Sequence, residues 1–254
     1  MTSPTEPRTL RLYHGGVAFE PVLASALVAM CVATFYLISG LVPVAFALLA
    51  GQVILVAGPV IAALAVGANH RVLGLRLPRK RYVTAAILIG LSAWYLNMRL
   101  VMWFEPPTDQ LERLERLVET APLFEALLML AVLPPLCEEL LFRGVLARSL
   151  ATRLPIWLAV GLSALLFSAY HLSLVQAPAT FTLGIVFAVL AIRADSIVPS
   201  IIAHGLNNAI AVLVSRDELS GVAHWLGHNP SPGLAICGAT TAAGLAIIAT
   251  GVKA

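Results

Sequence analysis

Charged residues are scarce in this sequence: Asp, Glu, Lys and Arg make up 11% of its 254 residues, whereas hydrophobic residues make up 59%. Soluble domains carry roughly 25% charged residues. A soluble fold of this size could not bury so much apolar surface. The composition therefore excludes an ordinary soluble protein and predicts an integral membrane protein with the lipid bilayer as its solvent.

Neither sign of charge dominates, because 16 Lys and Arg stand against 13 Asp and Glu. A formal net charge of +3 is too small to indicate nucleic acid as a partner. Cysteine is also rare: Cys31, Cys137 and Cys237 lie far apart in apolar runs, and no CxxC pair occurs. We expect buried thiols rather than disulfides or a zinc cluster.

The apolar residues form long continuous runs, which favour transmembrane helices over a β-barrel. We expect an all-α, polytopic transmembrane helix bundle of about eight spans. One membrane domain, residues 21–254, should follow a cytoplasmic N-terminal segment, residues 1–20. The predicted spans cover residues 21–39, 42–66, 82–104, 121–146, 156–173, 177–193, 197–214 and 233–251.

Basic residues between the spans predict the orientation in the membrane. The loop after the second span contains Arg71, Arg76, Arg79, Lys80 and Arg81. Such clusters stay in the cytoplasm, so we expect a multi-pass protein of the cell membrane with both termini cytoplasmic. Residues 109–120 carry leucines at three-residue spacing and predict a short amphipathic helix on the opposite membrane surface.

Several polar residues interrupt the apolar spans. A charge at mid-bilayer costs at least ~2.5 kcal/mol, so such residues are candidates for function. They are Glu138, Glu139, Arg143, His171, His204, Asn207 and Asn208.

Two adjacent glutamates lie in the fourth predicted span. Glu139 and Arg143 share a helix face four residues apart, so a structural ion pair explains Glu139 at least as well as catalysis does. Glu138 has no cation one turn away. A carboxyl group in apolar surroundings is a candidate general base, and we favour that role for Glu138. Pro134 and Pro135 lack backbone N–H groups and predict a kink just upstream.

Histidines occur in two later spans. A lone residue such as His171, near a helix end, is more often a polar tip at the membrane interface. His204 and Asn208 lie one turn apart and could offer two hydrogen-bond donors to an oxyanion. The alternative is hydrogen bonding between helices, which we prefer for Asn207.

Residue counting gives a crude test of whether these side chains lie at one depth. Glu138 and His171 lie 16 and 17 residues from a turn near Leu154, and therefore at similar depth. His204 lies only nine residues from the turn near Asp195. The count predicts a mismatch of roughly 10 Å between His204 and Glu138. The mismatch closes if the fourth and fifth helices protrude into the cytoplasm, as Arg148 and Arg153 would allow.

The polar residues fall into three motifs, in order along the chain. These read EExxxR at Glu138–Arg143, FxxxH at Phe167–His171 and HxxxN at His204–Asn208. In order and spacing they resemble the CPBP family, the CAAX-processing and bacteriocin-processing intramembrane proteases. The resemblance covers about residues 121–214, the expected protease core, and LGLRLP at 73–78 is also similar to a family loop.

The resemblance implies an intramembrane endopeptidase that acts on a membrane-associated protein or peptide. Glu138 would activate a water with the help of His171. His204 and Asn208 would stabilise the oxyanion of the tetrahedral intermediate.

The resemblance also implies that Glu139 and Arg143 support the site. Relatives process prenylated CAAX tails, bacteriocin precursors or C-terminal sorting signals, and the sequence does not choose among these substrates.

The family has also been described as metal-dependent, and a glutamate with two histidines could bind Zn²⁺. The HExxH motif, whose paired histidines would be expected in a zinc protease, does not occur. We therefore favour a metal-free glutamate mechanism without a cofactor, with zinc as the lesser alternative.

Two other functions remain open at this point. Glu, His and Arg within membrane spans also mark ion pathways, as in a proton-coupled transporter. That function predicts repeated halves with broken helices, which we do not find. A non-catalytic membrane partner or immunity protein on a protease-like fold is the other alternative, although every motif position is intact.

Overall fold

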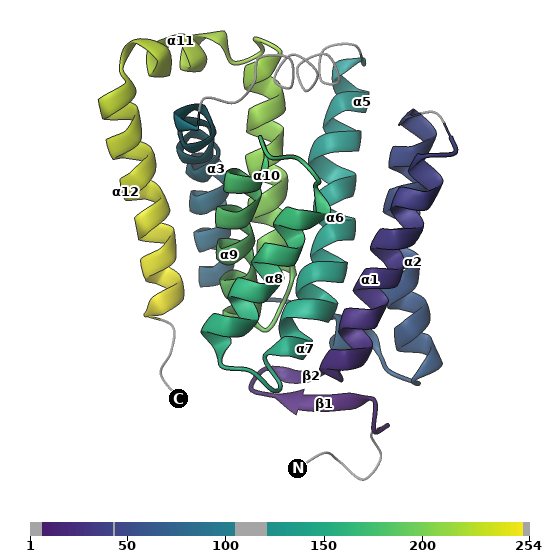
Figure 1. The fold of residues 1–254 in the computed structure, drawn as a ribbon. Coiled ribbons are helices and arrows are strands. Elements are labelled where there is room, and N and C mark those ends of the chain that lie inside the picture. The colour runs from purple at the N-terminus through teal and green to yellow at the C-terminus, as the bar shows by residue number, and fades with distance from the viewer. Residues whose placement is uncertain (1–6, 43, 105–120, 251–254) are drawn as a thin grey trace.

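The computed structural model describes residues 7–42, 44–104 and 121–250. Most of these residues form helices that run side by side as a bundle, with a small sheet beneath one end near the N-terminus (Figure 1). The expected amphipathic helix at residues 109–120 lies outside the described residues.

Helices occur at all eight predicted positions. Seven of these positions hold continuous helices: α1 (Pro21–Ser39), α2 (Val44–Ala65), α3 (Lys80–Trp103), α8 (Ile156–Tyr170), α9 (Ala177–Ala194), α10 (Val198–Ser215) and α12 (Pro230–Ala249). A short helix, α11 (Ser220–His228), precedes α12, and a 3₁₀ turn, η1 (His70–Leu73), follows α2.

The fourth predicted span is a broken helix. It consists of α5 (Leu123–Leu127), η2 (Leu128–Val132), α6 (Leu133–Glu139), η3 (Leu140–Ala147) and α7 (Arg148–Leu150), of which η2 and η3 are π-helical. Figure 1 shows these segments as one continuous column through the bundle.

The expected count of about eight membrane spans is not confirmed. Among the described residues, six helices are long and apolar enough to cross a membrane, namely α1, α2, α3, α9, α10 and α12. The α8 helix has 15 residues, which corresponds to about 22 Å, less than the hydrocarbon core of ~30 Å. The fourth span is interrupted by its π-helical segments. The six long helices indicate a multi-pass membrane protein.

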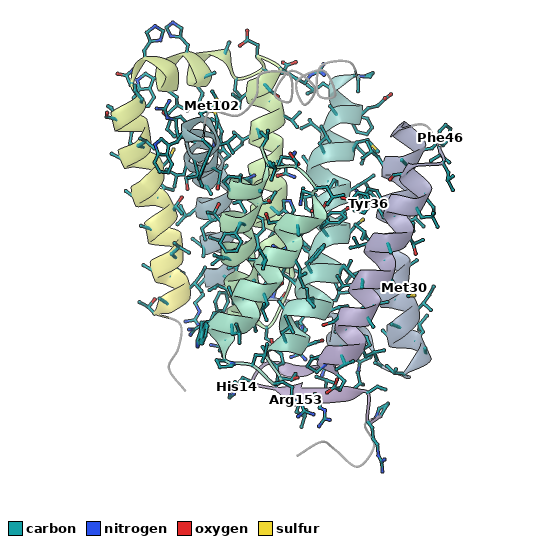
Figure 2. The ribbon with its side chains drawn as sticks, viewed as in Figure 1. His14, Met30, Tyr36, Phe46, Met102 and Arg153 are labelled. Atoms are coloured by element: carbon teal, nitrogen blue, oxygen red, sulfur yellow. The ribbon has the colours of Figure 1, made fainter. Side chains whose placement is uncertain are left out.

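Apolar side chains cover the outside of the bundle. Figure 2 shows Met30 and Phe46 pointing away from α1 and α2, and both are more than half exposed. Exposed apolar patches of this extent are unfavourable in water and expected in lipid.

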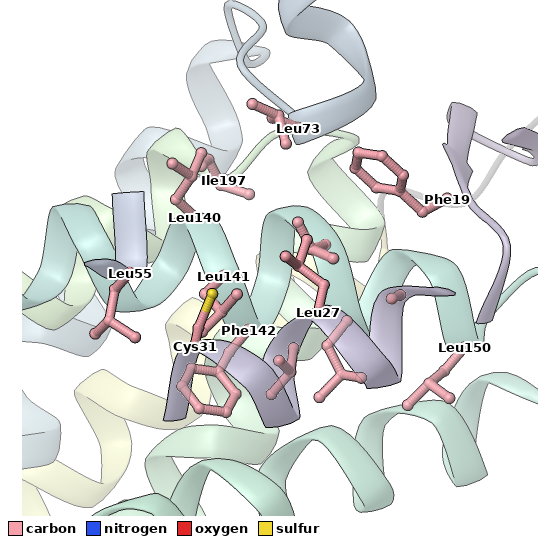
Figure 3. Packing of buried hydrophobic residues seen from close by; sticks show 14 of the residues in the cluster. Phe19, Leu27, Cys31, Leu55, Leu73, Leu140, Leu141, Phe142, Leu150 and Ile197 are labelled. Atoms are coloured by element: carbon pink, nitrogen blue, oxygen red, sulfur yellow. The ribbon is translucent and has the colours of Figure 1, made fainter. Parts of the chain in front are cut away.

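A buried apolar cluster joins α1 and α2 to the fourth helix column (Figure 3). Leu27, Cys31 and Leu55 pack there with Leu141 and Phe142 of η3. The three cysteines are free, and Cys31 and Cys137 are buried as expected, whereas Cys237 is only partly buried.

The first twenty residues hold a β-hairpin that the sequence analysis missed. Strands β1 (Leu10–Tyr13) and β2 (Gly16–Phe19) pair antiparallel, with Leu10 opposite Phe19. Leu10, Ala18 and Phe19 are buried, so the hairpin packs on the bundle and is part of the fold.

Candidate active site

The site begins with the prolines of α6. In an α-helix the Leu130 carbonyl would accept the N–H of residue 134, and in a π-helix that of residue 135. Both positions are proline, so neither can donate. The side chain of Asn208 on α10 supplies the missing donor, with its Nδ2 atom 2.9 Å from the Leu130 oxygen. The prolines thereby tie α10 to the broken helix.

The close approach of the two helices also depends on a glycine. A Cβ atom at Gly205 would lie 3.2 Å from the Ala131 oxygen, a carbonyl whose α-helical donor would be Pro135. Asn207 donates to the Asn208 side chain over 3.1 Å, which fixes the orientation of the Asn208 amide. Asn208 therefore bridges helices, and it keeps a second amide N–H that this bond does not use.

Glu139, one turn after Pro135, contacts both the Arg143 guanidinium and the His204 imidazole. Its Oε1 atom lies 3.0 Å from Arg143 Nη1 and 3.0 Å from His204 Nδ1. Glu139 and Arg143 are fully buried, and His204 is 5% exposed. The ion pair expected from the i, i+4 spacing is present, and a second contact joins it to α10. Burial makes each of these contacts matter more, because no water replaces a lost partner.

Glu138 faces the other nitrogen of the same imidazole. Its Oε2 atom lies 4.0 Å from His204 Nε2, and the residue is 5% exposed. This separation is longer than a hydrogen bond, and it is short enough for one water molecule to contact both atoms. His204 thus lies between the two glutamates, with one nitrogen toward each.

His171 lies at the end of α8, beside the ring of Phe167. The two ring centroids are 4.9 Å apart, and His171 Nδ1 lies 2.9 Å from the Phe167 carbonyl oxygen. A carbonyl only accepts, so Nδ1 carries the proton and Nε2 is left as an acceptor. The Phe167 ring centroid is also 6.0 Å from that of His204, so the rings of Phe167, His171 and His204 form one group.

The predicted depth mismatch between His204 and Glu138 is wrong. The fourth helix column continues to Leu150, and its Arg148 contacts Asp195 over 3.3 Å. Arg148 lies 148 − 138 = 10 residues after Glu138, and Asp195 lies 204 − 195 = 9 residues before His204. The two side chains are therefore level when counted from this contact rather than from Leu154, as expected if the fourth helix protrudes beyond the turn near Asp195.

Aromatic residues complete the walls, and of these only Phe167 holds a named motif position. Phe187 of α9 stacks on His204 at 4.9 Å between centroids, and Phe167 lies under the Arg143 guanidinium at 4.0 Å. Tyr36 of α1 donates its hydroxyl proton to the Tyr170 carbonyl, next to His171. No sequence motif marks these contacts, because each joins elements far apart in the chain.

The residues present do not form a metal-binding set. Within the described ranges, no group of three or more His, Cys, Asp or Glu side chains is arranged to hold a metal ion. The Glu138–His204 pair supplies two donor groups, whereas catalytic zinc takes three protein ligands.

Taken together, the fold and the site define a multi-pass membrane protein with a buried acid–histidine cluster between its helices. Residues 120–210 match the family model described as type II CAAX prenyl endopeptidase Rce1-like. This match contains all three motifs and confirms the resemblance to the CPBP family over that segment. It supports a CAAX-type protease, a hydrolase, in general terms. Comparison with curated proteins and with solved structures gave no match.

Proposed function

We propose that this protein is an intramembrane glutamic endopeptidase that hydrolyses a peptide bond of a membrane-associated protein or peptide. The observation that carries the proposal is the position of His204, with one ring nitrogen 3.0 Å from Glu139 and the other 4.0 Å from Glu138. A supported imidazole beside a second carboxylate is a usual arrangement for acid–base chemistry on water.

In the proposed reaction, Glu138 takes a proton from a water molecule held in its gap with His204. The water oxygen attacks the scissile carbonyl carbon, and Glu138 then passes the proton to the departing amine. The products are a carboxylic acid and a free amine, which exchange one proton to give a carboxylate and an ammonium group, so atoms and protons balance. His171 assists through Nε2, which can accept a hydrogen bond from the attacking water.

The developing oxyanion needs donors. If His204 Nδ1 donates to Glu139, its Nε2 can donate only in the imidazolium form. The Glu139 carboxylate supports that form, in the way a buried carboxylate stabilises the imidazolium of a hydrolase triad. The second amide N–H of Asn208 is the other proposed donor, and Arg143 holds Glu139 in place.

We propose further that the reaction uses no metal or other cofactor, and that both termini lie in the cytoplasm. The partners are the lipid bilayer and a membrane-associated substrate, not nucleic acid. Because the matched family description names a CAAX prenyl endopeptidase, a farnesylated CAAX peptide is the first probe.

The test compares membranes that contain the wild type, Glu138→Gln or no enzyme, by mass spectrometry of protein termini. We expect new termini with the wild type alone, and a synthetic peptide across the cleaved bond then serves for kinetics. Glu125→Gln, a glutamate on α5 outside the described site, is the matched control and should behave as wild type. Equal processing by the wild type and Glu138→Gln would contradict the proposal.

A further inference from the structure

A second buried charge cluster lies at the hairpin end of the bundle, away from the proposed site. Arg148 is fully buried at the start of α7. It contacts Asp195 Oδ1 over 3.3 Å and donates to the Val17 and Arg71 carbonyl oxygens, each over 3.3 Å. Its guanidinium also lies 5.2 Å from the ring centroid of Tyr13. One side chain thus joins α7, the hairpin, η1 and the turn before α10.

Asp195 is the other centre of the cluster. It ends α9 in a left-handed conformation, with φ of 49°, which orients the turn toward α10. Its carboxylate accepts the Tyr13 hydroxyl over 3.1 Å and forms an ion pair with Arg76. Arg76 in turn donates to the Gly15 carbonyl. The hairpin and the loop after η1 therefore meet on one carboxylate.

The start of α10 is bound to the same loop through its backbone. Ile197 N–H donates to the Gly74 carbonyl over 3.0 Å, and the Ser196 hydroxyl donates to the Arg76 carbonyl over 2.6 Å. Ser196 Oγ also accepts the Val198 N–H over 3.2 Å, at the first residue of α10. These contacts fix where α10 begins.

Two glycines let the loops approach the charges of the cluster closely. A Cβ atom at Gly74 would lie 2.4 Å from Arg148 Nη1, and one at Gly15 would lie 2.3 Å from Asp195 Oδ1. Gly74 also has φ of 74°, where a side chain is strained. A side chain at either glycine would push its loop away from the charges, so both glycines help the cluster to hold these elements together.

The two charged partners lie on the two elements that carry the proposed chemistry. Arg148 follows Glu138 by ten residues in the fourth helix column. Asp195 lies in the turn before α10 and precedes His204 by nine residues. A shift of α10 along its axis would directly change the 4.0 Å distance between Glu138 Oε2 and His204 Nε2. Misplacement by about 1 Å can cost ~100-fold in rate.

We propose that Arg148 and Asp195, braced by the N-terminal hairpin and the Gly74–Arg76 loop, are positioning residues that set the register of His204 against Glu138. This inference rests on the proposed function for its kinetic consequence. The register itself is a property of the folded protein and is measurable without turnover.

The test uses the full-length enzyme in lipid nanodiscs, with Asp195→Asn as the variant. Asparagine keeps the shape of the side chain and removes the charge that both arginines contact. We expect kcat for the synthetic peptide to fall at least ~10-fold with KM within about twofold, at temperatures well below unfolding. Amide hydrogen exchange in the first two turns of α10 should rise.

Arg153→Gln is the matched control, because Arg153 forms an exposed ion pair with Glu20 over 3.4 Å on the same end of the bundle. It should leave kcat, KM and exchange unchanged. If Asp195→Asn does not fold, Tyr13→Phe removes one hydrogen bond to the same carboxylate, and kcat should fall in the same direction by a smaller factor.

The outcomes separate the two proposals. A folded Asp195→Asn or Tyr13→Phe enzyme with wild-type kcat and wild-type exchange in α10 would overturn the positioning role. So would kcat losses that only track the folded fraction. Hydrolysis by Glu138→Gln at the wild-type rate would instead contradict the proposed function. Raised amide exchange in α10 of Asp195→Asn would still support the role of Arg148 and Asp195 in setting the register of His204.

Discussion

His204 Nδ1 lies 3.0 Å from Glu139 Oε1, and both residues are almost fully buried. The same carboxylate oxygen contacts Arg143. A cation, a carboxylate and an imidazole are therefore linked across two helices, and the free nitrogen of the imidazole faces Glu138.

Glu139→Gln should lower kcat by ~100-fold or more, because Gln cannot balance the imidazolium that the proposed mechanism requires. It should also destabilise the fold by about 3–5 kcal/mol, since Arg143 would remain buried without its counter-charge. Single-turnover rates and thermal unfolding in detergent measure the two effects.

Glu20→Gln is the control for that substitution. Glu20 pairs with Arg11 over 3.9 Å and with Arg153 over 3.4 Å near the surface, and such pairs contribute less than about 1 kcal/mol. A Glu139→Gln protein as stable and as active as Glu20→Gln would count against the buried network.

Asn208→Ala should cost about 1–3 kcal/mol of stability, because the Leu130 carbonyl loses its donor in a partly buried position. The cost should shrink when Pro134 and Pro135 are both replaced by alanine, since a backbone N–H then becomes available to Leu130. A double-mutant cycle on unfolding free energies measures this coupling. An equal cost in both backgrounds would show that Asn208 does not substitute for the missing N–H.

The hairpin should undock more readily in alkali. Burial raises the pKa of Tyr13 to about 12, above the ~10 of an unfolded chain. The folded state favours the neutral phenol, so the stability that Tyr13 contributes is complete below pH 10 and is lost as pH rises from 10 to 12. Melting temperatures of the wild type and Tyr13→Phe should converge over that range. A constant difference from pH 8 to 12 would be inconsistent with a buried phenol.

Chelators should not change the activity of the purified enzyme, because the proposed mechanism uses the side chains of Glu138 and His204 without a metal. Peptide hydrolysis is measured before and after incubation with 1,10-phenanthroline and after addition of Zn²⁺. Activity that is lost on chelation and restored by Zn²⁺ would replace the glutamate mechanism with a metal-dependent one.

The sequence predicts contacts within one helix, because these follow from helical spacing, but it does not predict the contacts between helices. Spacing i, i+4 correctly pairs Glu139 with Arg143, and long apolar runs correctly place the helices. It does not predict the link from Glu139 to His204, 65 residues later, because periodicity within one helix carries no information on its neighbours.

Two failures have a shared physical cause. Arg148 lies beyond the predicted end of the fourth span at residue 146, although it is buried on a helix that continues to Leu150. The residues around Tyr13 form two strands of four residues each, too short for a period to be recognised. In both cases the residues contact partners far away in the sequence, Asp195 among them, and helical or strand periodicity does not predict such contacts.

Rapid-quench kinetics of Glu138→Gln on the synthetic peptide address the main claim most directly. The glutamine keeps the volume of the side chain and removes its capacity to take a proton from water. We predict a kcat at least ~1,000-fold below the wild type, with peptide affinity retained. Turnover within tenfold of the wild type, by a variant that is folded and binds the peptide, would show that water is activated elsewhere.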